Sequence, residues 1–424
     1  MEPMSPQPNL DDLPELDTRF WALLIATAIA SGLAAGLLMR LLRAVQHLAW
    51  DYRSGTFFDA VARASVPRTL LVLTAAGLLI ALARRWLNQH GASHGGEVAA
   101  AIWLHEGRLN PWAALGSAVL SIVGVGMGVA LGREGAPKQA GAAAASMFAD
   151  LGRLSAPQRR LLAACGAGAG MAAVYDVPLG GALFALEVLL GMLSLRLVLP
   201  ALAASGIATA VSWLLLPHQV TYDLAFTAMP GLALLALAAA MGPVCGLAAV
   251  VHVRAIIWAD SRKLHGSTRM LALLAVLLAL GALALRWPQV LGNGKDVVGQ
   301  AMAQALPLAP LVALLALRLL ATTACLAAGA PGGLFTPTLA IGALLGGLLG
   351  HAVPGISTGT TALIGAGAFL AAATQGPISA LVLLVELTRR IDPQAVPLLL
   401  ATAGASLTAR VLERRSIYSA RLPP

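Results

Sequence analysis

The chain has 424 residues, of which 58% are hydrophobic and 11% are charged, whereas about 25% of the residues in an average soluble domain are charged. A chain this apolar has too few polar residues to cover a water-facing surface, which argues against a soluble enzyme or scaffold and indicates a polytopic membrane protein. The formal net charge is +9, but the basic residues lie in short segments between apolar runs, where lysine and arginine set membrane topology and contact anionic lipid headgroups. We therefore expect membrane lipid, and no nucleic acid, as a partner.

Residues 1–19 form the first predicted segment, a short cytoplasmic N-terminal tail. Acidic side chains precede the first apolar run here, whereas a secretory signal peptide begins with a basic region. The first span is therefore interpreted as uncleaved, and we expect a multi-pass protein of a bacterial inner (cell) membrane. The three cysteines, Cys165, Cys245 and Cys325, lie in apolar stretches and are interpreted as packing residues. No metal or cofactor is expected.

Long uncharged runs follow the tail, and each suits a helix that crosses a bilayer, which needs roughly 20 apolar residues. They lie at residues 20–39, 109–132, 197–216 and 224–251. A longer run without Asp, Glu, Lys or Arg, at residues 319–385, is interrupted by glycines and prolines and predicts several helices in tandem, some too short to span. The predicted fold class is all-α, with a first half of the membrane domain at residues 20–216 and a second half at residues 217–424.

The first candidate site is a loop of small residues, Gly-Ala-Ser-His-Gly-Gly at 91–96, which leaves the Ser93 hydroxyl and backbone amides exposed. Residues 91–95 also fit the nucleophile elbow of hydrolases, a motif that requires a preceding strand in a soluble α/β sheet. Membrane spans flank this loop instead, and the adjacent Ser93 and His94 side chains point in different directions, which disfavours a catalytic dyad. An intramembrane serine hydrolase is thus the least favoured alternative, and we expect the protein not to be an enzyme.

The most informative segment is Gly-Arg-Glu-Gly at 132–135, which closes an uncharged run. Its second glycine and the proline that follows indicate the start of a helix over about residues 136–148. The unpaired amides and the positive dipole end of such a helix form an anion site. Glu134 carries the same charge as a free anion, so the two could compete for one position, and a structural Arg133–Glu134 pair is the alternative. The residues assigned to this anion site are Gly132, Arg133 and Gly135.

A repeat relates the two halves of the chain. A proline precedes a glutamate by nine residues in each half, as Pro178 and Glu187 and as Pro377 and Glu386, and a glycine-rich break lies upstream of each pair. Matching interrupted helices are typical of channels and secondary transporters, although chance similarity in a chain rich in Ala, Gly and Leu is the alternative. Glu187 is predicted either to line an inner vestibule or to satisfy a helix end, and Glu386 to be a buried, hydrogen-bonded acid.

These motifs together resemble the CLC family of chloride channels and proton/chloride exchangers, over roughly residues 20–420. Residues 132–135 resemble the family's gating-glutamate motif. Residues 332–337, Gly-Gly-Leu-Phe-Thr-Pro, resemble its second anion-site loop, and Tyr418 resembles the tyrosine that coordinates the central anion. The resemblance implies a bundle of many tilted and broken helices in two inverted repeats, a homodimer with one pore in each subunit, and chloride or a similar small anion as the transported species.

The same resemblance implies roles for individual residues. Glu134 would be the external gate, and the amides of Leu334 and Phe335 would hold the central anion. The hydroxyls of Ser93 and Tyr418 would complete that site, because Ser93 precedes Glu134 by 41 residues, the spacing of the family's pore serine. Selectivity is expected to come from amides and hydroxyls rather than from a fixed lysine or arginine, which would bind an anion too tightly to release it.

Departures from the family pattern bear on the type of transport. Exchangers usually carry a proton-relay glutamate where this chain has Val188, and an aliphatic side chain cannot relay a proton. This favours a chloride channel, for which the resemblance implies voltage gating. A proton-coupled exchanger with Glu187 as the substitute relay is the alternative. The loop at 92–96 diverges and Pro137 is displaced by one position, but Ser93 is present, which favours chloride over fluoride.

Overall fold

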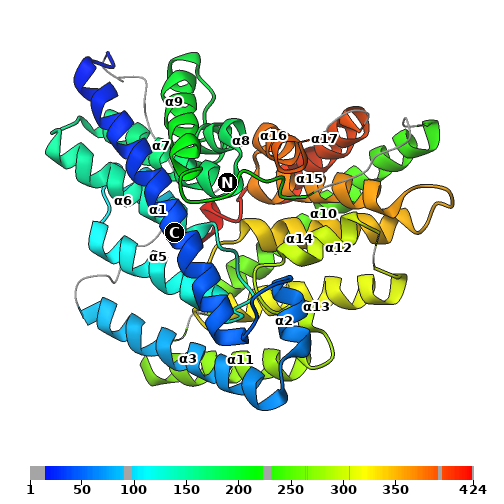
Figure 1. Cartoon of the computed structure of the whole chain (residues 1–424). Helices are drawn as coiled ribbons and strands as arrows, with labels where there is room; N and C mark the ends of the chain where they lie inside the picture. The colour runs from blue at the N-terminus through cyan, green and yellow to red at the C-terminus, as the bar shows by residue number, and fades with distance from the viewer. Residues whose placement is uncertain are drawn as a thin grey trace.

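A computed structural model describes residues 15–89, 98–222, 231–262, 264, 266–304, 306–389 and 394–422, and over these residues the protein is all-α, as predicted. Figure 1 shows helices that cross at many angles instead of forming one parallel bundle. In chain order the helical elements are α1 (Thr18–Trp50), α2 (Phe57–Arg63), α3 (Val66–Gln89), α4 (Val98–Leu104), α5 (Pro111–Gly126), α6 (Gly135–Leu151), α7 (Ala156–Tyr175), α8 (Pro178–Leu183), the π-helical turn η1 (Phe184–Leu190), α9 (Leu195–Ser212), α10 (Leu232–Ser261), α11 (Gly266–Ala284), the 3₁₀ turn η2 (Pro288–Val290), α12 (Lys295–Met302), α13 (Leu308–Ala327), α14 (Phe335–Gly350), α15 (Thr358–Thr374), α16 (Pro377–Thr388), α17 (Ala395–Leu412) and the 3₁₀ turn η3 (Ser419–Arg421).

Six of the described helices, α1, α3, α9, α10, α13 and α17, are long and apolar enough to cross a membrane. Their outer faces carry exposed leucines, such as Leu71 at 70% and Leu407 at 67% exposure, which in a bilayer contact lipid. Helices α14, α15 and α16 have 16, 17 and 12 residues, fewer than the roughly 20 needed to span. The tandem short helices predicted for residues 319–385 are therefore confirmed, and the chain is a multi-pass integral membrane protein.

The helices begin where local sequence signals place them. Asp17 accepts a hydrogen bond from the Phe20 amide at the start of α1, and Asn110 accepts one from the Ala113 amide at the start of α5. Both are capping side chains that pair otherwise unsatisfied amides. Proline occupies the first turn of α5, α7, α8 and α16, where its missing N–H costs nothing.

The packing of the first half is repeated in the second. Helix α7 packs against α1, α6, α8 and α9, and α15 packs in the same way against α10, α14, α16 and α17. The central helices α7 and α15 are buried over nearly their whole length, and α3 and α11 lie together below them in Figure 1. This matched pattern is what the repeated Pro-to-Glu spacing predicted.

Glycines permit the closest helix crossings in each half. A Cβ atom on Gly141 of α6 would overlap the carbonyl of Gly166 in α7, and a Cβ atom on Gly346 of α14 would overlap the carbonyl of Thr361 in α15. Small residues let backbones approach in this way in lipid, where packing replaces the hydrophobic effect as the force between helices. The three cysteines are buried and unpaired within this packing, as expected.

Candidate anion-binding site

The two glycine-rich breaks, one from each half, meet at the centre of the molecule. The Gly132 amide donates to the Gly333 carbonyl and the Gly333 amide donates to the Gly132 carbonyl, each at 2.7 Å. A Cβ atom at either position would overlap the carboxylate of Glu134, so a side chain there would have to displace that carboxylate. The pairing places the first turns of α6 and α14 beside each other.

Glu134 lies at this junction, fully buried. Its Oε1 accepts a hydrogen bond from the Phe335 amide at 2.6 Å, and its Oε2 accepts one from the Thr336 hydroxyl at 3.1 Å. The Tyr175 hydroxyl lies 3.4 Å from Oε2 and 2.6 Å from the Thr336 hydroxyl. The carboxylate therefore occupies the N-terminus of α14, the position that a free anion would take at a helix start.

Arg133 points away from its neighbour. Its guanidinium lies over the Tyr175 ring, 5.1 Å from the centroid, and the ion pairs between described side chains do not include one with Glu134. The structural pair that the sequence left open is thus not formed. Arg133 instead adds positive charge next to the junction, where the aromatic face partly offsets its desolvation.

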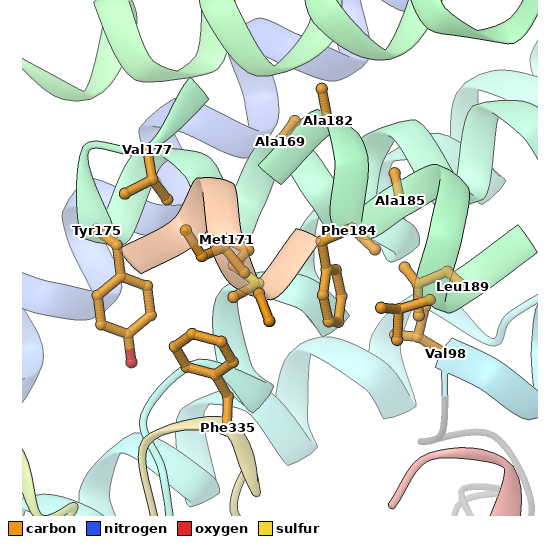
Figure 2. Close-up of a cluster of buried hydrophobic side chains, with 14 of the residues drawn as sticks. Val98, Ala169, Met171, Tyr175, Val177, Ala182, Phe184, Ala185, Leu189 and Phe335 are labelled. Atoms are coloured by element: carbon orange, nitrogen blue, oxygen red, sulfur yellow. The ribbon is translucent and has the colours of Figure 1, made fainter. Parts of the chain in front are cut away.

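Tyr418 reaches the same region from the end of the chain. The amide of Ile417 donates to the Ala373 carbonyl at 2.9 Å, which anchors the segment to α15. The Tyr418 ring packs edge-on against Phe184 at 5.5 Å between centroids. Figure 2 shows Phe184, Met171, Phe335 and Tyr175 around this interior, with the phenyl ring of Phe335 between those of Tyr175 and Phe184 in the view.

Lys138, which the sequence prediction did not include, lies at this site. Its ammonium is 3.4 Å from the Tyr418 hydroxyl and 4.5 Å from the Tyr418 ring centroid. It is also 5.1 Å from the ring centroid of Phe184. The available signal was its spacing, because Lys138 follows Glu134 by one helical turn and faces the same side of α6.

Of the remaining predicted anion ligands, Leu334 and Gly135 are placed by the structure and Ser93 is not. Leu334 is buried immediately before α14, so its backbone stands at the helix start, although its amide makes no hydrogen bond among those that the described residues form in turns and caps. Gly135 opens α6, three residues beyond Gly132, and a Cβ atom there would press on the Gly333 amide. Ser93 lies outside the described residues, so the first anion loop adds no geometry.

Glu187 and Glu386 cap each other's helices. The Glu187 carboxylate accepts hydrogen bonds from the Ser379 amide at 2.6 Å and the Ser379 hydroxyl at 2.7 Å, in the first turn of α16. The Glu386 carboxylate accepts one from the Gly180 amide at 2.6 Å, in the first turn of α8. Of the two roles left open for Glu187, the geometry favours satisfying a helix end. Glu386 is hydrogen-bonded as predicted but only partly buried.

Val188 is almost fully buried beside Gly376, in the π-helical turn η1. Its isopropyl group offers no proton donor or acceptor. Asp176, at the end of α7, pairs with Arg389 and with His218, and it accepts a hydrogen bond from the Trp213 indole at 2.8 Å. It serves that helix end and does not reach the junction at Gly132.

Comparisons with known proteins agree with this geometry. A family model described as "Voltage gated chloride channel" matches residues 71–410. The voltage-gated ClC-type chloride channel ClcB of Citrobacter koseri is 33% identical over 94% of this chain and 98% of its own length. The H⁺/Cl⁻ exchange transporter ClcA of Yersinia pestis is 31% identical over 70% of this chain, and the match spans 65% of that protein.

A solved structure shows the same fold. A slow cyanobacterial Cl⁻/H⁺ antiporter has a TM-score of 0.82 with 22% sequence identity, over 96% of this chain and 97% of that chain. These relatives are channels and transporters, not enzymes, so the hydrolase alternative drawn from residues 91–95 is set aside. The family match covers most of the chain, and the relative ClcB is 33% identical over nearly its whole length. The chain therefore belongs to the CLC family of voltage-gated chloride channels and proton/chloride exchangers.

Proposed function

We propose that the protein carries chloride across a bacterial inner membrane in exchange for protons, with Glu134 as the gate. One observation carries the proposal, namely the hydrogen bond of 2.6 Å from the Phe335 amide to the Glu134 carboxylate. A negatively charged side chain there occupies a helix start suited to an anion. Gate and substrate therefore compete for the same donor.

Protonation of Glu134 would release the gate. The charged carboxylate forms charge-assisted hydrogen bonds with the Phe335 amide and the Thr336 hydroxyl, which are stronger than those of a neutral acid. A proton removes that advantage, so the side chain leaves and chloride takes the freed donors. Loss of the proton on the other side of the site returns the carboxylate and expels the anion. One proton thus moves opposite to chloride in each cycle.

The chloride that replaces the carboxylate would be held by groups from both halves. We assign the Leu334 and Phe335 amides and the hydroxyls of Ser93 and Tyr418 to the central position. The start of α6, with Gly132, Arg133 and Gly135, would hold an anion on the outer side of the gate. We further propose that the chain forms a homodimer with one such pathway in each subunit.

A chloride channel is the second candidate, and Val188 favours it. An aliphatic side chain cannot pass a proton to Glu134, and the Glu187 carboxylate is already engaged by Ser379. The exchanger has the better support overall, because the named exchanger ClcA is a relative at 31% identity and because Glu134 is itself a proton-binding group in the anion position. The preference for a channel that the sequence suggested is therefore reversed.

Chloride efflux from liposomes, recorded together with proton movement, tests the proposal. The purified protein is reconstituted in liposomes with high internal chloride. A potassium ionophore is then added, so that potassium movement compensates the charge that chloride carries out. Proton uptake that accompanies chloride efflux, and that proceeds against a proton gradient, supports exchange. Chloride efflux without proton uptake supports the channel. An absence of chloride flux in both the wild type and Glu134→Gln would overturn chloride transport itself.

A further inference from the structure

A glycine-rich turn between η2 and α12 is fixed beside the segment that leads to the gate. Arg318, fully buried in α13, donates hydrogen bonds from Nη1 to the carbonyls of Val290 and Gly292, at 3.0 and 2.9 Å. The Gly292 amide donates to the Gly128 carbonyl at 3.0 Å. Because Gly128 lies in the segment that continues to Arg133, these bonds place the start of α12 near that segment.

Lys295 is the first residue of α12, and its side chain is partly buried. The ion pairs between described side chains do not include one with its ammonium group. The carboxylate of the neighbouring Asp296 instead accepts a hydrogen bond from the Phe58 amide in α2, at 3.0 Å. Helices α14 and α15 pack against α12 and contain no Asp, Glu, Lys or Arg. No carboxylate in the described part of the chain is therefore paired with this cation.

The charged group that affects Lys295 most is another cation, Arg133. Helix α12 is not among the described helices long enough to cross the membrane. Burial, followed by the positive charge of Arg133, lowers the pKa of Lys295 to about 8, whereas the charge of Asp296 raises this pKa and that of Arg43 lowers it further. Arg133 also lacks an ion pair among the described residues. Two neighbouring cations repel each other, and an anion bound between them stabilises the charged form of both.

We propose that Lys295 is a binding residue of the outer anion position, where its ammonium group and the Arg133 guanidinium together hold a small monovalent anion before it reaches Glu134. The inference rests on the proposed transport of chloride and adds a residue to that pathway. Unit charges about 4 Å apart in water attract by an amount equivalent to roughly fivefold in affinity, and partial burial strengthens the attraction. Because Lys295 stays partly exposed to solvent, the anion is still released, as conduction requires.

Chloride flux in liposomes, measured against chloride concentration at about pH 7, tests the inference. Lys295→Met and Lys295→Gln remove the charge, and Lys295→Arg retains it. Arg63→Met is the matched control, because it removes an exposed charge from the end of α2, the helix whose first turn binds Asp296. We expect the half-saturating chloride concentration to rise about three- to tenfold in both neutral variants. It should stay within about twofold of the wild type in the other two, and flux at saturating chloride should be retained in all four.

A pH series gives a readout that a purely structural role would not produce. It uses Glu134→Gln, which removes the titration of the gate. An ammonium group with a pKa of about 8 is charged at pH 7 and mostly neutral at pH 9. The half-saturating chloride concentration should therefore rise about two- to fivefold over this range. The rise should be absent when Lys295→Met or Lys295→Arg is added, because neither side chain titrates there. If Glu134→Gln carries no flux, calorimetric chloride binding in detergent gives the same comparison.

The outcomes separate this inference from the proposed function. Wild-type half-saturation in both neutral variants, with chloride flux intact in the wild type, overturns the role of Lys295 and leaves chloride transport standing. An absence of chloride flux in both the wild type and Glu134→Gln overturns chloride transport itself. A rise in Lys295→Arg or in Arg63→Met equal to that in the neutral variants indicates a packing role or a general effect of charge, and either result overturns the proposal. If Lys295→Met fails to fold, as judged by gel filtration, Lys295→Gln carries the comparison.

Discussion

Among the described residues, the carboxylates of Glu134, Glu187 and Glu386 accept hydrogen bonds from the first turn of a helix in the opposite half, but only Glu187 and Glu386 do so reciprocally. Glu187 caps α16 and Glu386 caps α8, and each arrangement mirrors the other. Glu134 caps α14, whereas α6, the corresponding helix of the first half, has no side-chain cap among the described residues. It carries Lys138 in its first turn instead.

The same interaction, a carboxylate that caps a helix, is thus proposed to be structural at Glu187 and Glu386 and functional at Glu134. A reciprocal pair of caps holds the two halves together, and both carboxylates stay where they are. At the centre the cap is unreciprocated among the described residues, so under the proposed function the start of α14 is closed by a carboxylate and the start of α6 receives the diffusible anion. Symmetry is broken at the position where the proposed transport takes place.

The largest expected effect is that of Glu134→Gln. A neutral amide resembles the protonated gate, so flux should become independent of pH and proton movement should cease. The wild type should keep a pH-dependent flux, because its gate carries an ionisable carboxyl. Chloride and proton fluxes in liposomes between pH 4.5 and 7.5 measure this. Glu386→Gln serves as the control that should keep the pH dependence, and a pH-dependent Glu134→Gln would refute the gate.

Removal of a helix cap away from the junction should lower stability and leave proton coupling unchanged. Glu187→Ala leaves the Ser379 amide and hydroxyl without their partner, which should cost about 1–3 kcal/mol of stability. The chloride-to-proton ratio should remain that of the wild type, because the carboxylate does not contact the junction. Thermal unfolding in detergent measures the first expectation and liposome fluxes the second. Loss of proton coupling in a folded Glu187→Ala would show that this residue is the proton relay after all.

A smaller effect is expected from Thr336→Val, which weakens the binding of the Glu134 carboxylate to the start of α14 without abolishing it. The substitution removes one hydroxyl donor to the Glu134 carboxylate and leaves the Phe335 amide in place. A charged hydrogen bond is worth about 1.5–3 kcal/mol, so the charged gate is less stable and opens at a higher pH. The midpoint of flux against pH should move upward by about one to two units. Thr360→Val, at the start of α15 and away from the junction, should leave the midpoint unchanged.

Much of this site could be predicted from local sequence. Glycines on either side of Glu134 and the break at residues 332–337 are short-range signals for helix starts, and the structure brings the two together. The partners of each carboxylate could not be read in this way. Glu187 meets Ser379 across 192 positions, and Glu134 meets Phe335 across 201.

Lys138 escaped prediction for the same physical reason. A lysine in an apolar run reads as a topology signal or an interface residue. Its ammonium contacts Tyr418, which is 280 positions away and reaches the centre because the last segment folds back onto α15. The aliphatic side chain of Val188 predicts that this position relays no proton, but that prediction says nothing about the relatives that this chain matches at 31% identity.

The paired hydrogen bonds between Gly132 and Gly333 have a mechanical consequence. They tie the two helix starts together at the level of the gate, and in a low-dielectric interior their loss without water to replace them would cost several kcal/mol. A rocking of one half against the other would have to break this tie at every turnover. The proposed gate requires no such movement, because only the Glu134 side chain would move within a frame that these two hydrogen bonds hold together.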